Sequence, residues 1–201
     1  CEHNNAITYS DWCSVPSVPS QQNDKQVLTD ITGDGRLDWI VLQPGLNGFF
    51  TLNDDQTWQS FTPFSAVPSE LLNGEGVFAN ITGAGLSDVA VIGPNSVRFY
   101  PNIRQGFSQG EQTALNALNA PLPMLRHNER TLVAFGDVLG SGQSHLIEIT
   151  EKTVHCWPNL GRGEFGDRIE FDWLWSGDCA FQPHRLYMVD LDGSGADSLV
   201  Y

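Results

Sequence analysis

Asp30-Ile31-Thr32-Gly33-Asp34-Gly35-Arg36-Leu37-Asp38 is the stretch that decides the fold, because variants of it return three more times. The four copies, called loops 1 to 4 below, occupy residues 30–38, 80–88, 137–145 and 190–198. Successive copies begin 50, 57 and 53 residues apart. Such a period is typical of propellers, solenoids and arrays. The two glycines in each copy permit positive φ angles, which a tight connection between two strands requires.

Short apolar runs flank every loop and are bounded by Gly, Asp and Asn, as strands are. In the first repeat, residues 27–28 lead into the loop, and residues 39–42, 49–52 and 58–61 are three further predicted strands. Four strands per repeat indicate a propeller blade. The predicted fold class is therefore all-β, a β-propeller of four-stranded blades forming part of a ring. A solenoid is the alternative, but its coils contribute single parallel strands, whereas these repeats contain hairpins.

The remaining repeats follow the same plan, with predicted strands at residues 89–92, 97–100, 146–149 and 154–157. Tyr100-Pro101-Asn102 and Trp157-Pro158-Asn159 stand at equivalent places in two repeats. Residues 111–120 carry Thr113 as their one β-branched residue and are predicted to form a short helix. The predicted domains are a linker or edge segment over 1–24 and propeller repeats over 25–201. The repeats span 25–76, 77–131, 132–185 and a truncated 186–201.

Composition restricts the classes of function. The 201 residues are 40% hydrophobic, enough to bury a core, and the net charge of −14 gives a pI of about 4.4. This charge argues against nucleic acid and against anionic membranes, and it is compatible with cation binding. No apolar run approaches the length of a membrane-spanning helix, and no signal peptide is recognisable. Because residue 1 is Cys and the fourth repeat stops one strand after its loop, we expect a piece of a longer protein.

Loop 1 is the strongest candidate site. Asp30, Thr32, Asp34 and Asp38 supply oxygens at positions one, three, five and nine, and the carbonyl of Arg36 can join them. Three carboxylates, a hydroxyl and a carbonyl suit Ca²⁺ better than Mg²⁺, so a structural calcium site is predicted. The alternative is that these side chains build a turn by accepting backbone N–H groups.

The other loops are weaker candidates for calcium. Loop 4 offers Asp190, Asp192 and Ser194, but its last acid, Asp197, stands at position eight instead of nine. Loop 2 has Ala84 at position five, and loop 3 is expected to be a metal-free turn.

An enzymatic function has one sequence signal. Gly106-Phe107-Ser108-Gln109-Gly110 matches the G-x-S-x-G of a nucleophile elbow, which needs a buried strand before the serine and a helix after it. Pro101 and Arg104 precede it instead, and the equivalent stretch of the next repeat has no serine. A hairpin turn explains both copies, so no catalytic residue is predicted.

Cysteine and aromatic residues leave alternatives open. The four cysteines could form two disulfides in three possible pairings. A zinc site formed by His155, Cys156, Cys179 and His184 is a weaker hypothesis. Aromatic side chains are expected to pack between blades more often than to bind sugars. Trp173-Leu174-Trp175 is the candidate exception, since it lies in a connection between blades. The four cysteines are Cys1, Cys13, Cys156 and Cys179.

The loops with their flanking strands resemble FG-GAP or VCBS-type repeats, known from integrin α-subunit propellers. The segments that connect the loops point to a narrower family. Their sequence and order are similar to those of the B component of bacterial insecticidal toxin complexes, the Tc toxins. The match covers residues 25–201. It rests on the segments 28–38, 43–50, 58–64, 81–88, 92–98, 156–161 and 190–195.

The resemblance implies a function that is not enzymatic. The B component's propeller docks onto a pentameric A-component channel of a secreted complex. The rest of that component forms, with the C component, a cocoon around a toxin, and the propeller gates its release. The alternative is an integrin- or lectin-like adhesion propeller that binds a protein or a glycan.

Overall fold

The computed structural model describes residues 11, 13–15, 19, 26–93, 96–114, 118–125, 130–172 and 180–201. The fold is all-β, and the sheets are antiparallel. Sheet 1 holds β1 (Gln26–Thr29), β2 (Asp38–Gln43), β3 (Leu46–Phe50) and β4 (Thr62–Pro63). Sheet 2 holds β5 (Val77–Ala79), β6 (Asp88–Ile92), β7 (Ser96–Tyr100) and β8 (Glu111–Ala114).

Sheet 3 repeats this order with one insertion. It holds β9 (Thr131–Gly136), β10 (His145–Thr150), β11 (Thr153–Trp157) and β14 (Ile169–Asp172). The short hairpin of β12 (Asn159–Gly161) and β13 (Glu164–Phe165) stands between β11 and β14. A final pair follows, β15 (Tyr187–Val189) and β16 (Ser198–Val200). The described helices are α1 (Ser69–Asn73) and the 3₁₀ turn η1 (Pro183–Arg185).

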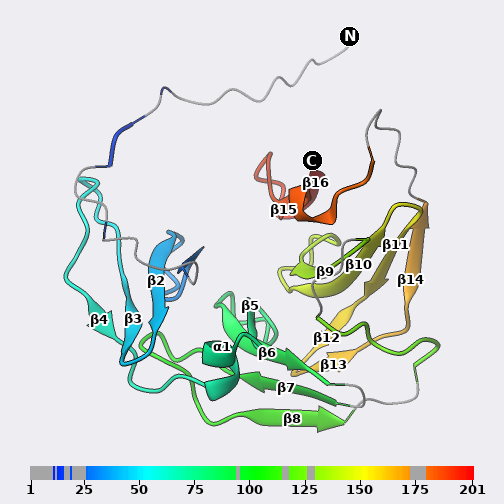
Figure 1. Cartoon of the computed structure of the whole chain (residues 1–201), viewed down its shortest axis with the longest axis horizontal. Helices are drawn as coiled ribbons and strands as arrows, with labels where there is room; N and C mark the ends of the chain where they lie inside the picture. Colours follow the sequence, from blue (N-terminus) through cyan, green and yellow to red (C-terminus); the bar gives the residue numbers. More distant parts are fainter. Residues whose placement is uncertain are drawn as a thin grey trace.

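The sheets follow one another around an arc (Figure 1). In sheets 2 and 3 the first strands, β5 and β9, lie toward the middle of the arc, and the last strands, β8 and β14, lie on its outside. Among the described residues, no helix is long and apolar enough to cross a membrane.

The hydrophobic core lies between neighbouring sheets. Val89 of β6 belongs to the cluster shared with sheet 1, whereas its neighbour Ala90 belongs to the cluster shared with sheet 3. In the same way, Leu146 of β10 faces sheet 2 and Ile147 faces the β15–β16 pair. Because successive side chains of a strand point to opposite faces, β6 and β10 are apolar on both faces and are nearly continuous hydrophobic runs.

Helix α1 is fixed to sheet 2 by a polar contact. The Oε1 atom of Glu70 accepts hydrogen bonds from the Tyr100 hydroxyl at 2.6 Å and from Arg98 at 3.1 Å. These donors, the Tyr100 hydroxyl foremost, lower the pKa of the Glu70 carboxyl to about 2. The contact joins the connection between two repeats to the sheet that follows it.

Most predicted strands are confirmed, among them residues 39–42, 89–92 and 146–149, which lie within β2, β6 and β10. The helix predicted over 111–120 is wrong at its start, because Glu111–Ala114 forms β8 and pairs with β7. Backbone pairing at the sheet edge outweighs the local helix propensity there. The aromatic segment 173–175 lies outside the described residues.

The second half of the first repeat also differs from its prediction. The hairpin turn is the two-residue Pro44-Gly45, with φ of 79° at Gly45, so β3 already begins at Leu46. The predicted strand 58–61 is absent as such. Trp58 makes an isolated bridge to Leu52, and the fourth strand is β4, Thr62–Pro63.

Candidate functional site: the loop edge

The Gly-rich loops lie at one end of the sheets. Each joins the first two strands of a repeat, and the turns 52–58, 102–107 and 159–165 follow the third strand. Because strand direction alternates in these antiparallel sheets, both kinds of connection reach the same end. We call this end the loop edge. The paired glycines of all four loops have φ between 64° and 85°, as their tight turns were predicted to need.

The residue at position nine closes loops 1 and 2 from inside. Asp38 is fully buried, and its Oδ2 atom accepts hydrogen bonds from the backbone N–H groups of Ile31 at 3.0 Å and Thr32 at 3.1 Å. Asp88 makes the same two bonds in loop 2 and is 1% exposed. A buried carboxylate requires such donors, so this aspartate builds the loop.

The acid at position one closes the outer turn. Asp30 accepts hydrogen bonds from Gly33 N at 2.6 Å and from Gly35 N at 2.8 Å. Asp137 and Asp190 accept from positions five and six of loops 3 and 4, of which position six is shared with loop 1. The turn-building role that the sequence offered as the alternative to calcium therefore accounts for these contacts.

Calcium in loop 1 stays a prediction. Asp34 accepts a hydrogen bond from Arg36 N at 2.9 Å, while Thr32 Oγ1 and Asp38 Oδ1 are buried without a hydrogen-bond partner. These two orphaned oxygens belong to the predicted ligand set and fit a cation. Among the described residues, however, no three His, Cys, Asp or Glu side chains gather closely enough to hold a metal ion.

Asn102 connects loop 1 of the first repeat to the second repeat. Its amide Nδ2 donates to the carbonyl of Ile31 at 3.0 Å and to that of Ser87 at 3.1 Å. Its backbone N–H donates to Asp88 Oδ1 at 2.9 Å, and its Oδ1 accepts from Arg104 N at 2.6 Å. Both the amide nitrogen and the amide oxygen thus have partners, which makes Asn102 a clamp between two sheets.

Asn159 is the same clamp one repeat later. Its Nδ2 donates to the carbonyls of Ile81 and Ser144, both at 3.1 Å, and its Oδ1 accepts from Gly161 N at 2.7 Å. Its backbone N–H donates to His145 Nδ1 at 2.9 Å. The sequence identified the repeated aromatic-Pro-Asn tripeptide but missed this role, although its recurrence after the third strand of the second and third repeats was the available signal.

Position eight provides a second link between repeats. The Ser144 hydroxyl accepts a hydrogen bond from Asn80 N at 3.0 Å, and Ser144 N donates to the Asn80 carbonyl at 3.0 Å. Asp197 Oδ2 accepts from Asp137 N at 2.7 Å, and Asp197 N donates to the Asp137 carbonyl at 2.9 Å. The placement of Asp197 at position eight, which the sequence left unexplained, thus serves the junction with the preceding repeat.

The loop edge exposes an aliphatic side chain in each of its first three repeats. The exposed fractions are 56% for Leu37, 53% for Ile103 and 63% for Leu160. Ile103 and Leu160 each directly follow a clamp asparagine. Beside Leu37, Arg36 forms an ion pair with Asp54 across two connections of the first repeat. Isolated apolar side chains are ordinary on surfaces, but a repeated row of them favours a contact surface.

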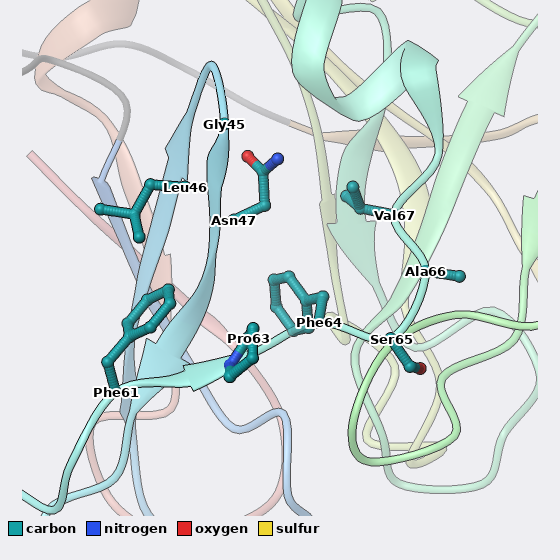
Figure 2. A pocket seen from close by; sticks show the side chains of 9 residues that line it. All are labelled: Gly45, Leu46, Asn47, Phe61, Pro63, Phe64, Ser65, Ala66 and Val67. Atoms are coloured by element: carbon teal, nitrogen blue, oxygen red, sulfur yellow. The ribbon is translucent and has the colours of Figure 1, made fainter.

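A groove of about 410 Å³ lies beside sheet 1. Figure 2 shows the turn before β3 on one side and the segment from Phe64 to Val67 on the other. The Asn47 side chain points between them, and its Oδ1 is buried without a hydrogen-bond partner. Gly45, Leu46, Phe61, Pro63, Ser65 and Ala66 complete the lining.

Within the part of the chain that the structure describes, the geometry does not support the sequence alternatives for catalysis and zinc. The Ser108 hydroxyl is 3.4 Å from the carbonyl of Gln109, and strand β8 follows it where an elbow needs a helix. His155 contacts Glu148 at 3.0 Å and Glu170 at 3.3 Å. Cys13 and Cys156 are free thiols, whereas Cys1 and Cys179 lie outside the described residues.

Comparisons with known proteins place the chain in a family. No protein-family profile and no curated protein sequence matches it. Among solved structures, it is 43% identical to a chain of the Tc holotoxin pore of Photorhabdus luminescens that carries a TccC3 variant, with a TM-score of 0.76. The match covers 98% of this chain and 9% of that chain.

A second likeness concerns the fold alone. An N-acetylglucosamine-recognising lectin of Agrocybe aegerita is 19% identical, with a TM-score of 0.56, over 87% of this chain and 45% of the lectin. The identity to the Tc holotoxin chain is more than twice as high as the identity to the lectin and extends over nearly the whole chain, so it decides the family. The chain therefore belongs to the Tc toxin family, as a segment related to its B component.

Proposed function

We propose that this chain is a non-enzymatic β-propeller module that docks the toxin-carrying B–C cocoon onto an A-component channel and gates toxin release. The observation that carries the proposal is the 43% identity to the Tc holotoxin pore over 98% of the chain. Because the chain spans only 9% of that relative, the partners are proposed for the longer polypeptide to which such a segment belongs. Its proposed partners are the pentameric A component and the C-component toxin subunit, in a secreted complex.

The arrangement of the sheets supports the propeller part of the proposal. Four-stranded antiparallel sheets follow one another around an arc, and each packs its apolar faces against its neighbours. These are the properties of propeller blades. A closed ring of such blades would place the first strands, including β5 and β9, around a central passage. A gate for an unfolded toxin chain requires such a passage.

The loop edge is the surface that we assign to docking. It combines the exposed side chains of Leu37, Ile103 and Leu160 with the acidic loops. Its loops are joined to one another by the clamps, so the surface is held rigidly across repeats. A rigid surface loses little conformational entropy on binding, which favours affinity.

Interferometry with a purified A-component pentamer tests this proposal. The polypeptide carrying these residues, assembled with its C component, is expected to bind the pentamer both in calcium and in chelator. Ile103→Asp and Leu160→Asp should weaken binding at least tenfold, because each buries a charge in an interface. Leu46→Asp is the matched control, since Leu46 is 47% exposed at the opposite end of the sheets.

The outcomes separate docking from its assigned surface. Absence of binding by the unmodified protein would contradict the docking role and make the adhesion alternative the next to test, on a glycan array. Binding that Leu46→Asp weakens and Ile103→Asp leaves unchanged would retain docking but move it to the other end. The lectin likeness concerns the fold and favours no glycan ligand for this chain.

A further inference from the structure

His145 occupies the place in loop 3 that Asp38 and Asp88 occupy in loops 1 and 2. It is 2% exposed, and both of its ring nitrogens have partners. Nδ1 lies 2.9 Å from the backbone nitrogen of Asn159, which can only donate a hydrogen bond. Nδ1 must therefore carry its lone pair, and the single ring proton of the neutral imidazole lies on Nε2.

The Nε2 side of the ring is complementary to that tautomer. Nε2 lies 3.0 Å from the Ser141 hydroxyl and 3.3 Å from Asp137 Oδ1, and both oxygens can accept its proton. The neutral ring thus makes one accepted and one donated hydrogen bond inside a buried site. A second proton could bind only at Nδ1, where it would face the N–H of Asn159.

Protonation of His145 therefore acts on the clamp between sheets 2 and 3. The backbone N–H of Asn159 would lose its acceptor and meet another donor, and a buried donor without a partner is costly. The side-chain amide of the same residue holds the carbonyls of Ile81 and Ser144 together. Displacing Asn159 would loosen both hydrogen bonds at once.

The preceding junction lacks this sensitivity. There Asp88 Oδ1 accepts the backbone N–H of Asn102 at 2.9 Å, and the clamp is otherwise equivalent. An ordinary aspartate remains ionised well below pH 6, whereas an ordinary histidine titrates near pH 6.5. Mild acid is therefore expected to weaken the junction that contains His145 and to leave the junction that contains Asp88 intact, although the two share one geometry.

The charges around His145 determine the direction of the effect. Asp137 is the ionisable group in contact with the ring, and Asp197 of the next repeat bonds to the backbone of Asp137. Burial lowers the pKa of His145 below its ordinary value, and the negative charge of Asp137 opposes this only in part. In the opened state the ring accepts a proton at higher pH than in the closed state. Falling pH therefore favours opening.

We propose that His145 makes the junction between sheets 2 and 3 an acid-sensitive joint, which loosens below about pH 6.5 while the junction between sheets 1 and 2 stays closed. The joint rests on the contacts of His145 and Asn159 and does not depend on the docking role. In a ring of blades, such a joint would select the seam at which the ring first opens.

Amide hydrogen exchange with residue-level fragmentation tests this joint in the complete polypeptide. Protection factors of Asn159 and Asn102 are compared at pH 7.5 and pH 5.5, after correction for intrinsic exchange rates. Protection of Asn159 should fall by about tenfold per pH unit once the ring titrates, whereas protection of Asn102 should change less than about twofold. Equal changes at the two asparagines, or none at either, would overturn the proposal.

His145→Asp supplies the matched variant, because it installs the residue that repeat 2 uses. It should retain the Asn159 bond and abolish the pH dependence of its protection. A variant that still loses Asn159 protection in acid would also refute the joint. The comparison of the two asparagines in the unmodified protein does not depend on whether the variant folds.

Discussion

Replacing Asn102 by alanine should destabilise the protein far more than its loop position would suggest. The substitution removes the donors to the carbonyls of Ile31 and Ser87 and the acceptor for Arg104 N. A hydrogen bond contributes about 0.5 to 1.5 kcal/mol net, so three give about 3 kcal/mol. The residue is 8% exposed, so water replaces the lost partners poorly and the loss should be felt in full.

Urea unfolding followed by tryptophan fluorescence measures this free energy. Ile103→Ala is the control, because its side chain is adjacent but 53% exposed and should change stability by less than about 0.5 kcal/mol. Asn102→Asp should cost more than Asn102→Ala, since it places a carboxylate against two carbonyl oxygens. If Asn102→Ala behaved like the Ile103 control, the clamp would not hold the sheets together.

Three further predictions concern other parts of the chain. Calcium at 10 mM should stabilise the protein by about 1 to 3 kcal/mol if loop 1 binds the ion with the affinity typical of extracellular calcium sites. Asp34→Asn should abolish this gain, and equal melting temperatures in calcium and in chelator would contradict the site. Because the folded pKa of Glu70 is about 2, below its ordinary 4.5, its contribution is complete above pH 4.5 and fades toward pH 2. Glu70→Gln should keep the bond from Tyr100, remove that pH dependence in acid titrations, and cost about 1 kcal/mol at pH 7. Gly163→Ala should lower the free energy of unfolding by about 1 to 3 kcal/mol, because φ is 75° and a Cβ would lie 2.9 Å from Phe99. Thermal unfolding measures this loss, and an unchanged melting temperature would show that the loop relaxes freely.

The repeated loop predicted much of the fold, because its requirements are local. Glycines at fixed positions and apolar runs on both sides define a strand, a turn and a strand without any other part of the chain. Hence β2, β6 and β10 were predictable. Edge strands were not, since β4 and β8 are fixed by pairing with a neighbour and not by their own residues.

The candidate site was predictable only in part for the same reason. The role of Asn102 depends on a carbonyl of the preceding repeat, 71 residues away, which no local pattern reveals. Asp197 was read as a displaced ligand of its own loop, whereas its carboxylate bonds to Asp137 of another repeat. His145 lies in loop 3, which was expected only to be a metal-free turn, whereas the structure gives it the acceptor role of Asp88. Contacts between repeats thus explain the residues that break the repeat pattern.

A cryo-electron microscopy map of the complete polypeptide, assembled with its C component on an A-component pentamer, tests the central claim most directly. The proposal predicts that residues 26–201 form consecutive blades of a closed ring, with the loop edge against the channel and Ile103 and Leu160 in contact with it. A map that places these residues inside the cocoon or on its far side, with a different segment on the channel, would contradict the docking role.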